Sequence, residues 1–179
     1  QVRQVAANAD SIESDIDLLL VVHPKSLPET TVYAIDQFVV NGGRAIVMVD
    51  PMCMADNQQQ AANPFMGMMN RASEVPALFK AWGVDYNSGK IAADVNSATQ
   101  VNMGPHGLGN HPLWLSLKGE SFNREAAISG KLNGMLLVNA GILSKAANSA
   151  FEFTSILQTS AAGNEIDMMK AMSTPDEIA

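Results

Sequence analysis

The sequence contains little cysteine and little positive charge, and each shortage excludes a class of protein. Cys53 is the only cysteine among 179 residues, so an internal disulfide and a zinc site built from several thiolates are excluded. A single thiol is compatible with the cytosol and equally with a bacterial periplasm. The 11 basic residues form no cluster, and with 18 acidic residues the net charge is −7. Because nucleic acids and anionic membrane surfaces are bound through basic faces, neither is an expected partner.

Long apolar runs and targeting segments are also missing. No run approaches the roughly 18–20 residues that cross a bilayer, and no stretch has the pattern of a signal peptide. Because the chain begins at Gln1 rather than at a methionine, we expect it to be part of a longer protein. The hydrophobic content of 47% is typical of a globular protein and argues against disorder.

The clearest pattern is a strand, a helix and a second strand over residues 17–49. The run DLLLVV, residues 17–22, is continuously apolar after its first residue, which is typical of a strand buried on both faces of a parallel sheet. Ser26 and Glu29 have the spacing of a capping box, so a helix is expected to start there. Gly42-Gly43 predicts its end, and AIVMV, residues 45–49, predicts a second buried strand. The pattern therefore predicts a βαβ unit.

Shorter patterns predict the rest of the chain. Residues 75–82 favour a short helix that ends at a glycine, and residues 90–95 favour a strand that pairs with residues 99–103. Residues 134–141 favour a further strand. We therefore predict one α/β domain over residues 1–163. It carries a long Met- and Gln-rich loop insertion at residues 52–73 and is followed by a weakly structured tail at residues 164–179.

Three residues are candidates for binding a ligand. Open α/β sheets bind ligands beyond the carboxyl ends of their strands, and His23 and Asp50 each follow one of the two predicted strands. Trp82 is the third candidate, and Trp114 shares its property, because aromatic rings stack on sugars. A simpler explanation exists for Asp50-Pro51, in which the aspartate caps a turn and the proline stops the strand.

Cys53 raises the alternative of a cysteine-dependent hydrolase. A turn that presents a nucleophile needs small residues beside the thiol, whereas Cys53 is flanked by Met52 and Met54. His23 is a conceivable base, but the sequence identifies no group to orient it. We therefore predict no catalytic residue and interpret Cys53 as a bystander.

No metal and no cofactor is predicted. His106 and His111 lie in a glycine-rich loop without an accompanying metal-binding motif. Gly42-Gly43 leads from a helix into a strand, which is the reverse of the order in phosphate-binding loops.

Three blocks of sequence carry a family resemblance. They are HPKSLPETTVYAIDQFVVNGGRAIVMVDP at residues 23–51, LFKAWGVDYNSGKIAAD at residues 78–94 and LQTS at residues 157–160. In this order they resemble the extracytoplasmic domain of the gliding-motility-type ABC transporter auxiliary proteins, which are substrate-binding-like components. The resemblance implies an α/β fold with a mainly parallel sheet flanked by helices, similar to class I glutamine amidotransferase-like and flavodoxin-like folds. The family is not known for enzymatic activity and supplies no ligand-binding motif.

The resemblance also implies a location and partners. It implies the periplasmic face of a bacterial inner membrane, with membrane anchors outside this chain, and association with an ABC permease and its ATPase. The expected function is scaffolding or ligand recognition beside the permease, and homo-oligomerisation is left open. Two alternatives remain: an amidotransferase-like hydrolase that uses Cys53, and a module that binds envelope polysaccharide through Trp82 and Trp114.

Overall fold

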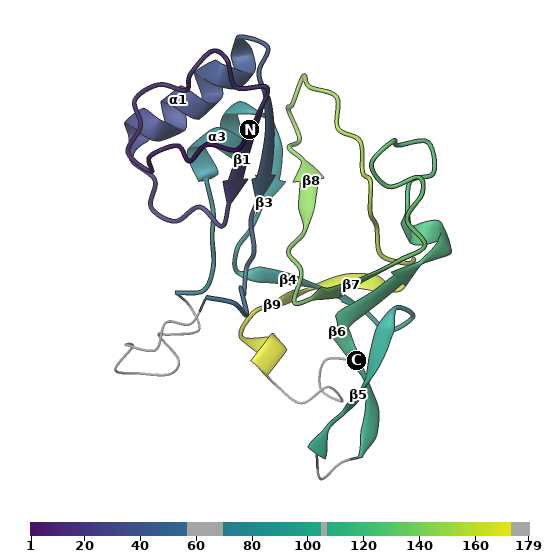
Figure 1. The fold of residues 1–179 in the computed structure, drawn as a ribbon. Coiled ribbons are helices and arrows are strands. Elements are labelled where there is room, and N and C mark those ends of the chain that lie inside the picture. The colour runs from purple at the N-terminus through teal and green to yellow at the C-terminus, as the bar shows by residue number, and fades with distance from the viewer. Residues whose placement is uncertain (57–69, 105–106, 173–179) are drawn as a thin grey trace. The chain divides into compact units, whose positions relative to one another are not determined.

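A computed structural model describes residues 1–56, 70–104 and 107–172 (Figure 1). The chain forms two compact units, one of residues 1–86 and 144–151 and the other of residues 87–143 and 152–179. A division into compact units does not decide how many parts fold independently, so the single domain expected over residues 1–163 stays a prediction. Most of the predicted loop insertion, residues 57–69, lies outside the described residues, as does the end of the predicted tail.

The first unit begins with the predicted βαβ unit. Strand β1 (Leu18–Val22), helix α1 (Glu29–Val40) and strand β2 (Arg44–Met48) follow one another, and β1 pairs with β2 in parallel. The short helix α3 (Pro76–Ala81) confirms the second predicted helix. No described helix is long and apolar enough to cross a membrane.

The sequence patterns predicted the end of α1 correctly and the cap at its start wrongly. The predicted capping box is wrong, because Pro28 is the N-cap residue and no side chain caps the helix. Ser26 lies before the N-cap and has a left-handed backbone, with φ 48°. The predicted glycine stop is confirmed, since Gly42 has φ 95° and its N–H donates to the Val39 carbonyl at 2.9 Å.

The core of the first unit lies on one side of the β1–β2 pair. Its buried residues come from β1, α1 and α3 with the residue before α3, and they are Leu19, Ile35, Val75, Leu78 and Phe79. The other side of the pair carries five side chains that are 43–60% exposed: Leu18, Leu20, Val22, Ile46 and Met48. The prediction that both strands are buried on both faces is therefore wrong. We call these five side chains the outer face.

The second unit is built from antiparallel strands. Strand β4 (Lys90–Asp94) pairs with β9 (Gly163–Asp167), and β6 (Leu108–Lys118) lies between β5 (Ala98–Asn102) and β7 (Gly134–Val138). Lys90 lies 3.1 Å from Asp167 and 3.4 Å from Glu165 on the neighbouring strand. The expected partner of residues 99–103 was wrong, because β5 pairs with β6.

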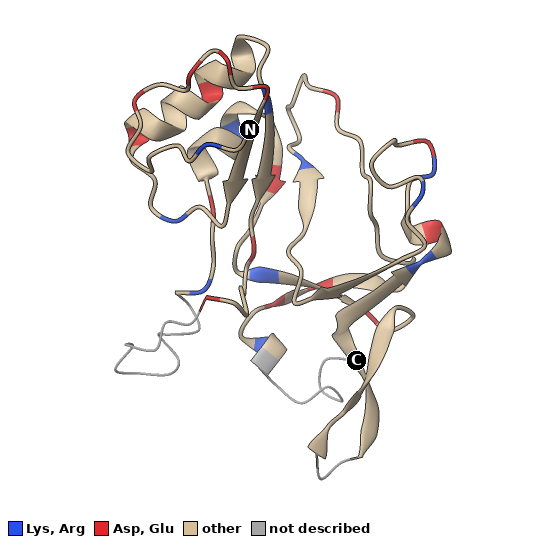
Figure 2. Cartoon of the chain, in the orientation of Figure 1, with Lys and Arg blue, Asp and Glu red and all other residues tan. Residues whose placement is uncertain are grey.

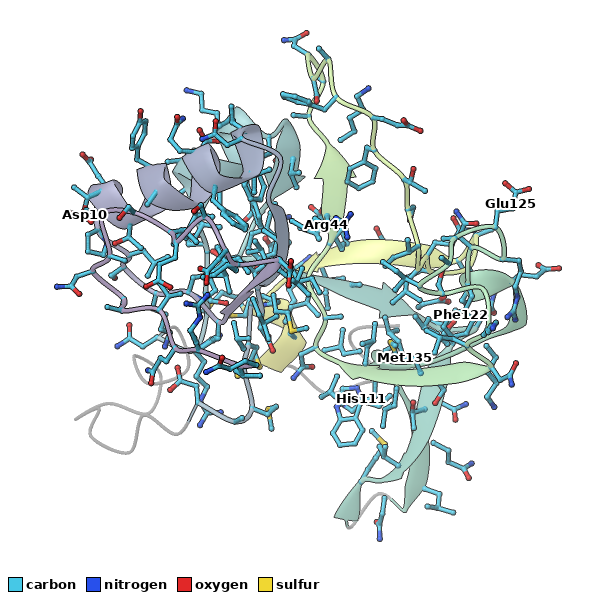
Figure 3. The ribbon with its side chains drawn as sticks, turned by 45° about the horizontal axis from the view of Figure 1, so that its top comes forward. Asp10, Arg44, His111, Phe122, Glu125 and Met135 are labelled. Carbon is cyan, nitrogen blue, oxygen red and sulfur yellow. The ribbon has the colours of Figure 1, made fainter. Side chains whose placement is uncertain are left out.

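Two further pieces complete the described structure. Strand β3 (Val84–Tyr86) pairs with β8 (Leu143–Lys145), and short 3₁₀ turns occupy Gly119–Ser121 and Lys170–Met172. The core of the second unit contains Ala92, Leu115, Leu117 and Phe122, and the partly buried Met135 packs against it (Figure 3).

The predicted fold class is wrong. A mainly parallel sheet flanked by helices, as in amidotransferase-like and flavodoxin-like folds, would need a crossover between most successive strands. The β1–β2 pair is parallel, whereas β4–β9, β5–β6 and β6–β7 are antiparallel, and the described residues form few helices. Only residues 103–107 join β5 to β6, which suits a hairpin and is too short for the dozen or more residues of a crossover. The sequence-based prediction extended one βαβ unit over the whole chain.

Candidate functional site at the carboxyl ends of β1 and β2

The parallel pairing brings two of the predicted residues to one edge of the first unit. His23 follows β1 directly, and its N–H donates to the Met48 carbonyl at the end of β2 at 2.9 Å. Asp50 lies two residues beyond Met48. His23 has a left-handed backbone, with φ 49°, and this turns the chain away from the strand direction. The structure therefore places His23 and Asp50 at the carboxyl edge, where fold logic expected them.

Lys25 and Asp56 join His23 in an ionic cluster. The imidazole Nε2 of His23 lies 3.2 Å from Asp56 Oδ2, and Lys25 Nζ donates to the same oxygen. Lys25 also donates to the carbonyl of Asn70. The three side chains are 20–29% exposed, so water screens them only partly. The cluster ties the segment after β1 to both ends of the stretch between residues 56 and 70.

Asp50 has a structural role in the same region. Its Oδ1 accepts a hydrogen bond from the Met52 N–H at 2.7 Å, which closes a turn through the side chain. Its N–H donates to Ser73 Oγ at 2.9 Å, and its carbonyl accepts from the Ser73 N–H at 2.9 Å. The turn-capping explanation of Asp50 is therefore confirmed, and its role in binding a ligand stays a prediction.

Around this edge, the buried polar atoms without a hydrogen-bond partner among the described residues include Nδ1 of His23 and the hydroxyl of Tyr86. Burial raises the pKa of Tyr86, and the negative charges of Asp50 and Glu74 raise it further, so the phenol stays protonated at neutral pH. A buried polar atom without a partner costs free energy. The edge therefore offers hydrogen-bonding positions that the described residues leave unused.

Trp82 lies apart from this cluster. It is the C-cap residue of α3, and its Nε1–H donates to Asp36 Oδ1 on α1 at 3.0 Å. This bond ties the two helices together, and the proposed contact of Trp82 with a ligand stays a prediction. Trp114 belongs to β6 of the second unit, where its ring centroid lies 5.7 Å from that of His111.

The remaining sequence candidates are placed as follows. Cys53 is half-buried, and its N–H donates to the Arg71 carbonyl at 3.1 Å. Burial lowers the pKa of His111, whereas His106 lies outside the described residues. Within residues 1–56, 70–104 and 107–172, no three His, Cys, Asp or Glu side chains lie close enough together to hold a metal ion.

Sequence reasoning missed Lys25, Asp56 and Tyr86. Lys25 lies two positions after His23, so a search for charged residues beyond the strand end would have found it. Asp56 is 33 positions from His23, and only the folded chain brings the two together. The arrangement pairs opposite charges around a turn, a chemistry suited to holding segments in place and to hydrogen bonding with a ligand.

The fold and the cluster define a mostly antiparallel protein with one βαβ unit and a polar edge at the ends of its parallel strands. The chain belongs to the ABC transporter auxiliary family: a family model described as "ABC-type uncharacterized transport system" matches residues 1–178. The resemblance to ABC transporter auxiliary proteins is thereby confirmed. No curated protein matches the chain, and no solved structure does.

Proposed function

We propose that this chain is a non-catalytic, extracytoplasmic scaffolding domain that docks on the permease of its ABC transport system. The outer face of the β1–β2 pair carries the proposal. Parallel strands are normally covered on both faces, and here the described core covers one. Contiguous exposed apolar side chains mark interaction surfaces, and burying one aliphatic side chain contributes about 1.5–3 kcal/mol.

The permease is the partner that best fits this surface. Family membership supplies an ABC transport system, whose ATPase works on cytoplasmic ATP. An extracytoplasmic domain at the periplasmic face of a bacterial inner membrane, anchored by segments outside this chain, meets the permease directly and the ATPase through it. Apart from Arg44 at the start of β2, the exposed side chains on this side of the strand pair are apolar, and this supports a protein partner.

A charge on the outer face is expected to break this contact. Leu20 is 56% exposed, so Leu20→Lys leaves the core intact but places an ammonium group in the proposed interface. Co-purification of the permease with the tagged full-length protein should fall at least about tenfold, since burying an unpaired charge exceeds the 1.4 kcal/mol that this factor represents.

Val40→Lys is the matched control. Val40 is 68% exposed on α1 and lies outside the outer face. The Val40→Lys protein should co-purify the permease at the wild-type level. Equal recovery of the permease by Leu20→Lys and wild type, with unchanged circular dichroism, would contradict docking through this face.

The hydrolase alternative is tested at Cys53. The thiol belongs to a turn whose backbone bonds to Arg71, and methionines flank it on both sides. Cys53→Ala is therefore expected to complement a deletion strain as well as the wild-type gene does, with immunoblots showing equal protein levels. Loss of complementation by a variant that keeps its level and its fold would overturn the non-catalytic proposal.

Ligand recognition at the carboxyl edge is a second candidate function. Buried atoms of His23 and Tyr86 that have no hydrogen-bond partner in the described part of the chain favour it, because a ligand that reached them would recover the free energy that their isolation costs. The hydroxyl of Tyr86 would act as a donor to such a ligand, since its pKa is raised.

A further inference from the structure

A groove of about 580 Å³ crosses the first unit at the end of the strands opposite to the ionic cluster. One wall is the segment of residues 10–17 and the other is α1, while Gly42, Gly43 and Arg44 close it at the start of β2. None of the five outer-face side chains lines it, although Arg44 of the groove is the register partner of Leu18, so the groove adjoins the proposed docking surface.

We propose that this groove binds a neutral oligosaccharide. Tyr33 and Phe38 supply aromatic rings, and Tyr33 is 64% exposed. The negative face of an aromatic ring attracts the C–H groups on the apolar face of a sugar. Planar polar side chains bind the neighbouring hydroxyl groups of a sugar ring in pairs, and the groove contains several: Asp10, Asp17, Gln37, Asn41 and Arg44.

Several of these polar groups are available to a ligand. In the described part of the chain, no side-chain hydrogen bond or ion pair involves Asp17, Asn41 or Arg44. Asp17 and Arg44 are both exposed, and Arg44 is the register partner of Leu18, the residue after Asp17. The groove therefore presents an acceptor, a donor and an amide without first breaking internal contacts.

The wall of the groove is held in place before any ligand arrives. Arg3 lies 2.6 Å from Glu13 and 2.7 Å from Asp15, and these exposed pairs link the segment to the start of the chain. The hydrogen bond to Asp15 is the main reason why the pKa of Arg3 is raised, and the same bond lowers the pKa of Asp15. Thr31 Oγ1 on α1 also donates to the Ala7 carbonyl at 3.1 Å. A preformed wall reduces the entropy lost on binding.

Glycine shapes the floor of the groove. A Cβ atom at Gly43 would lie 2.5 Å from Phe38 Cε1, so the absence of a side chain lets the aromatic ring lie against the backbone. Gly42 has open space around it. The two glycines thus stop the helix and also leave room beside the ring.

The charge pattern favours a neutral ligand over a charged one. Acidic residues lie along the segment of residues 10–17 and on α1, where the cartoon in Figure 2 is coloured red, and their charges would repel a polyanion. Asp10 and Arg44, labelled in Figure 3, carry opposite charges at the groove. A basic peptide would be attracted by the aspartates but repelled by Arg44, and it would not require the exposed ring of Tyr33.

The test titrates the 179-residue chain with cellohexaose, maltohexaose and chitohexaose, and with hexalysine as the peptide probe. At least one hexasaccharide should bind by calorimetry and shift the backbone amide resonances of Gly42 and Gly43. Tyr33→Ala should weaken that binding at least about tenfold, as truncating an aromatic anchor does, whereas Tyr33→Phe keeps the ring and should retain it.

Control and contrary outcomes are well separated. Val40→Ala, on α1 but outside the groove lining, should bind as the wild type does. Binding of hexalysine alone, no binding of any of the three sugars, or sugar binding that Tyr33→Ala leaves unchanged would each overturn the proposal. None of these results bears on recovery of the permease, so the docking proposal is tested separately.

Discussion

Asp94→Ala is expected to lower the free energy of unfolding of the second unit by about 2–4 kcal/mol, because it removes the acceptor of four hydrogen bonds. Asp94 ends β4 and is 1% exposed. Its Oδ1 accepts from the Asn96 N–H at 2.9 Å and from Ser160 Oγ at 2.8 Å. Its Oδ2 accepts from Ser97 Oγ at 2.8 Å and from the Ser160 N–H at 2.7 Å. The carboxylate therefore joins the end of β4 to the segment that precedes β9.

The same contacts make the stability of this unit depend on pH. Burial alone would raise the pKa of Asp94, but the bonds from Ser160, Ser97 and Asn96 outweigh it and hold the pKa below its ordinary value. The unfolded chain therefore binds a proton more readily than the folded chain. The stabilisation is complete above the ordinary carboxyl pKa of about 3.9 and is lost as pH falls through the lower folded-state value.

Urea unfolding at pH 7 and at pH 3, with hydrogen exchange of the β4 and β9 amides, measures both effects. Wild type should lose protection in these strands on acidification, and Asp94→Ala should show weak protection at both pH values. Glu125→Ala removes the same charge from an exposed position and should resemble wild type (Figure 3). Matching unfolding curves and matching pH dependence for the two variants would rule out a stabilising role for the Asp94 contacts.

The sequence predicted the features that depend on neighbouring residues. The βαβ unit follows from apolar runs separated by a helical pattern, and the end of α1 follows from the ability of Gly42 to adopt a positive φ. The placement of His23 and Asp50 at one edge follows from parallel pairing. Each of these inferences uses contacts within a single helix or strand, or between elements that are consecutive in the chain.

Contacts between distant positions were beyond such reasoning. Asp56 meets His23 across 33 positions, and Asp94 meets Ser160 across 66. Nothing local to an aspartate indicates which distant donor it will meet. Strand direction failed for a related reason, because an apolar run of five residues has the same composition in a parallel and in an antiparallel pair.

The prediction that β1 is buried on both faces failed for a separate physical reason. Side chains alternate between the two faces of a strand, so LLLVV requires apolar surroundings on both sides to be fully buried. The described core covers Leu19, and the face with Leu18, Leu20 and Val22 is left exposed. The apolar pattern is explained if a second surface covers this face in the assembled transporter, and this is the basis of the docking proposal.

Gly43→Ala is expected to destabilise the first unit by about 2–3 kcal/mol, the usual range for overpacking. The new methyl group would lie 2.5 Å from Phe38 Cε1 and 2.6 Å from the Phe38 carbonyl oxygen. The ring is able to rotate, but the carbonyl accepts the Gly43 N–H at 2.9 Å and cannot move without breaking that bond. The end of α1 and the start of β2 would shift together.

Gly42→Ala separates this collision from the effect of backbone conformation. Gly42 has φ 95° and nothing within 4 Å of an added Cβ, so alanine there costs only the left-handed backbone, about 1–2 kcal/mol. Urea unfolding of both variants should therefore rank Gly43→Ala as the less stable. Hydrogen exchange should also show that Gly43→Ala loses protection at the β2 amides. The reverse order would mean that the left-handed turn, rather than the close approach of Phe38, fixes glycine at this position. Because Phe38 also lines the groove, displacement of its ring by Gly43→Ala should weaken the binding of any hexasaccharide that Tyr33 recognises.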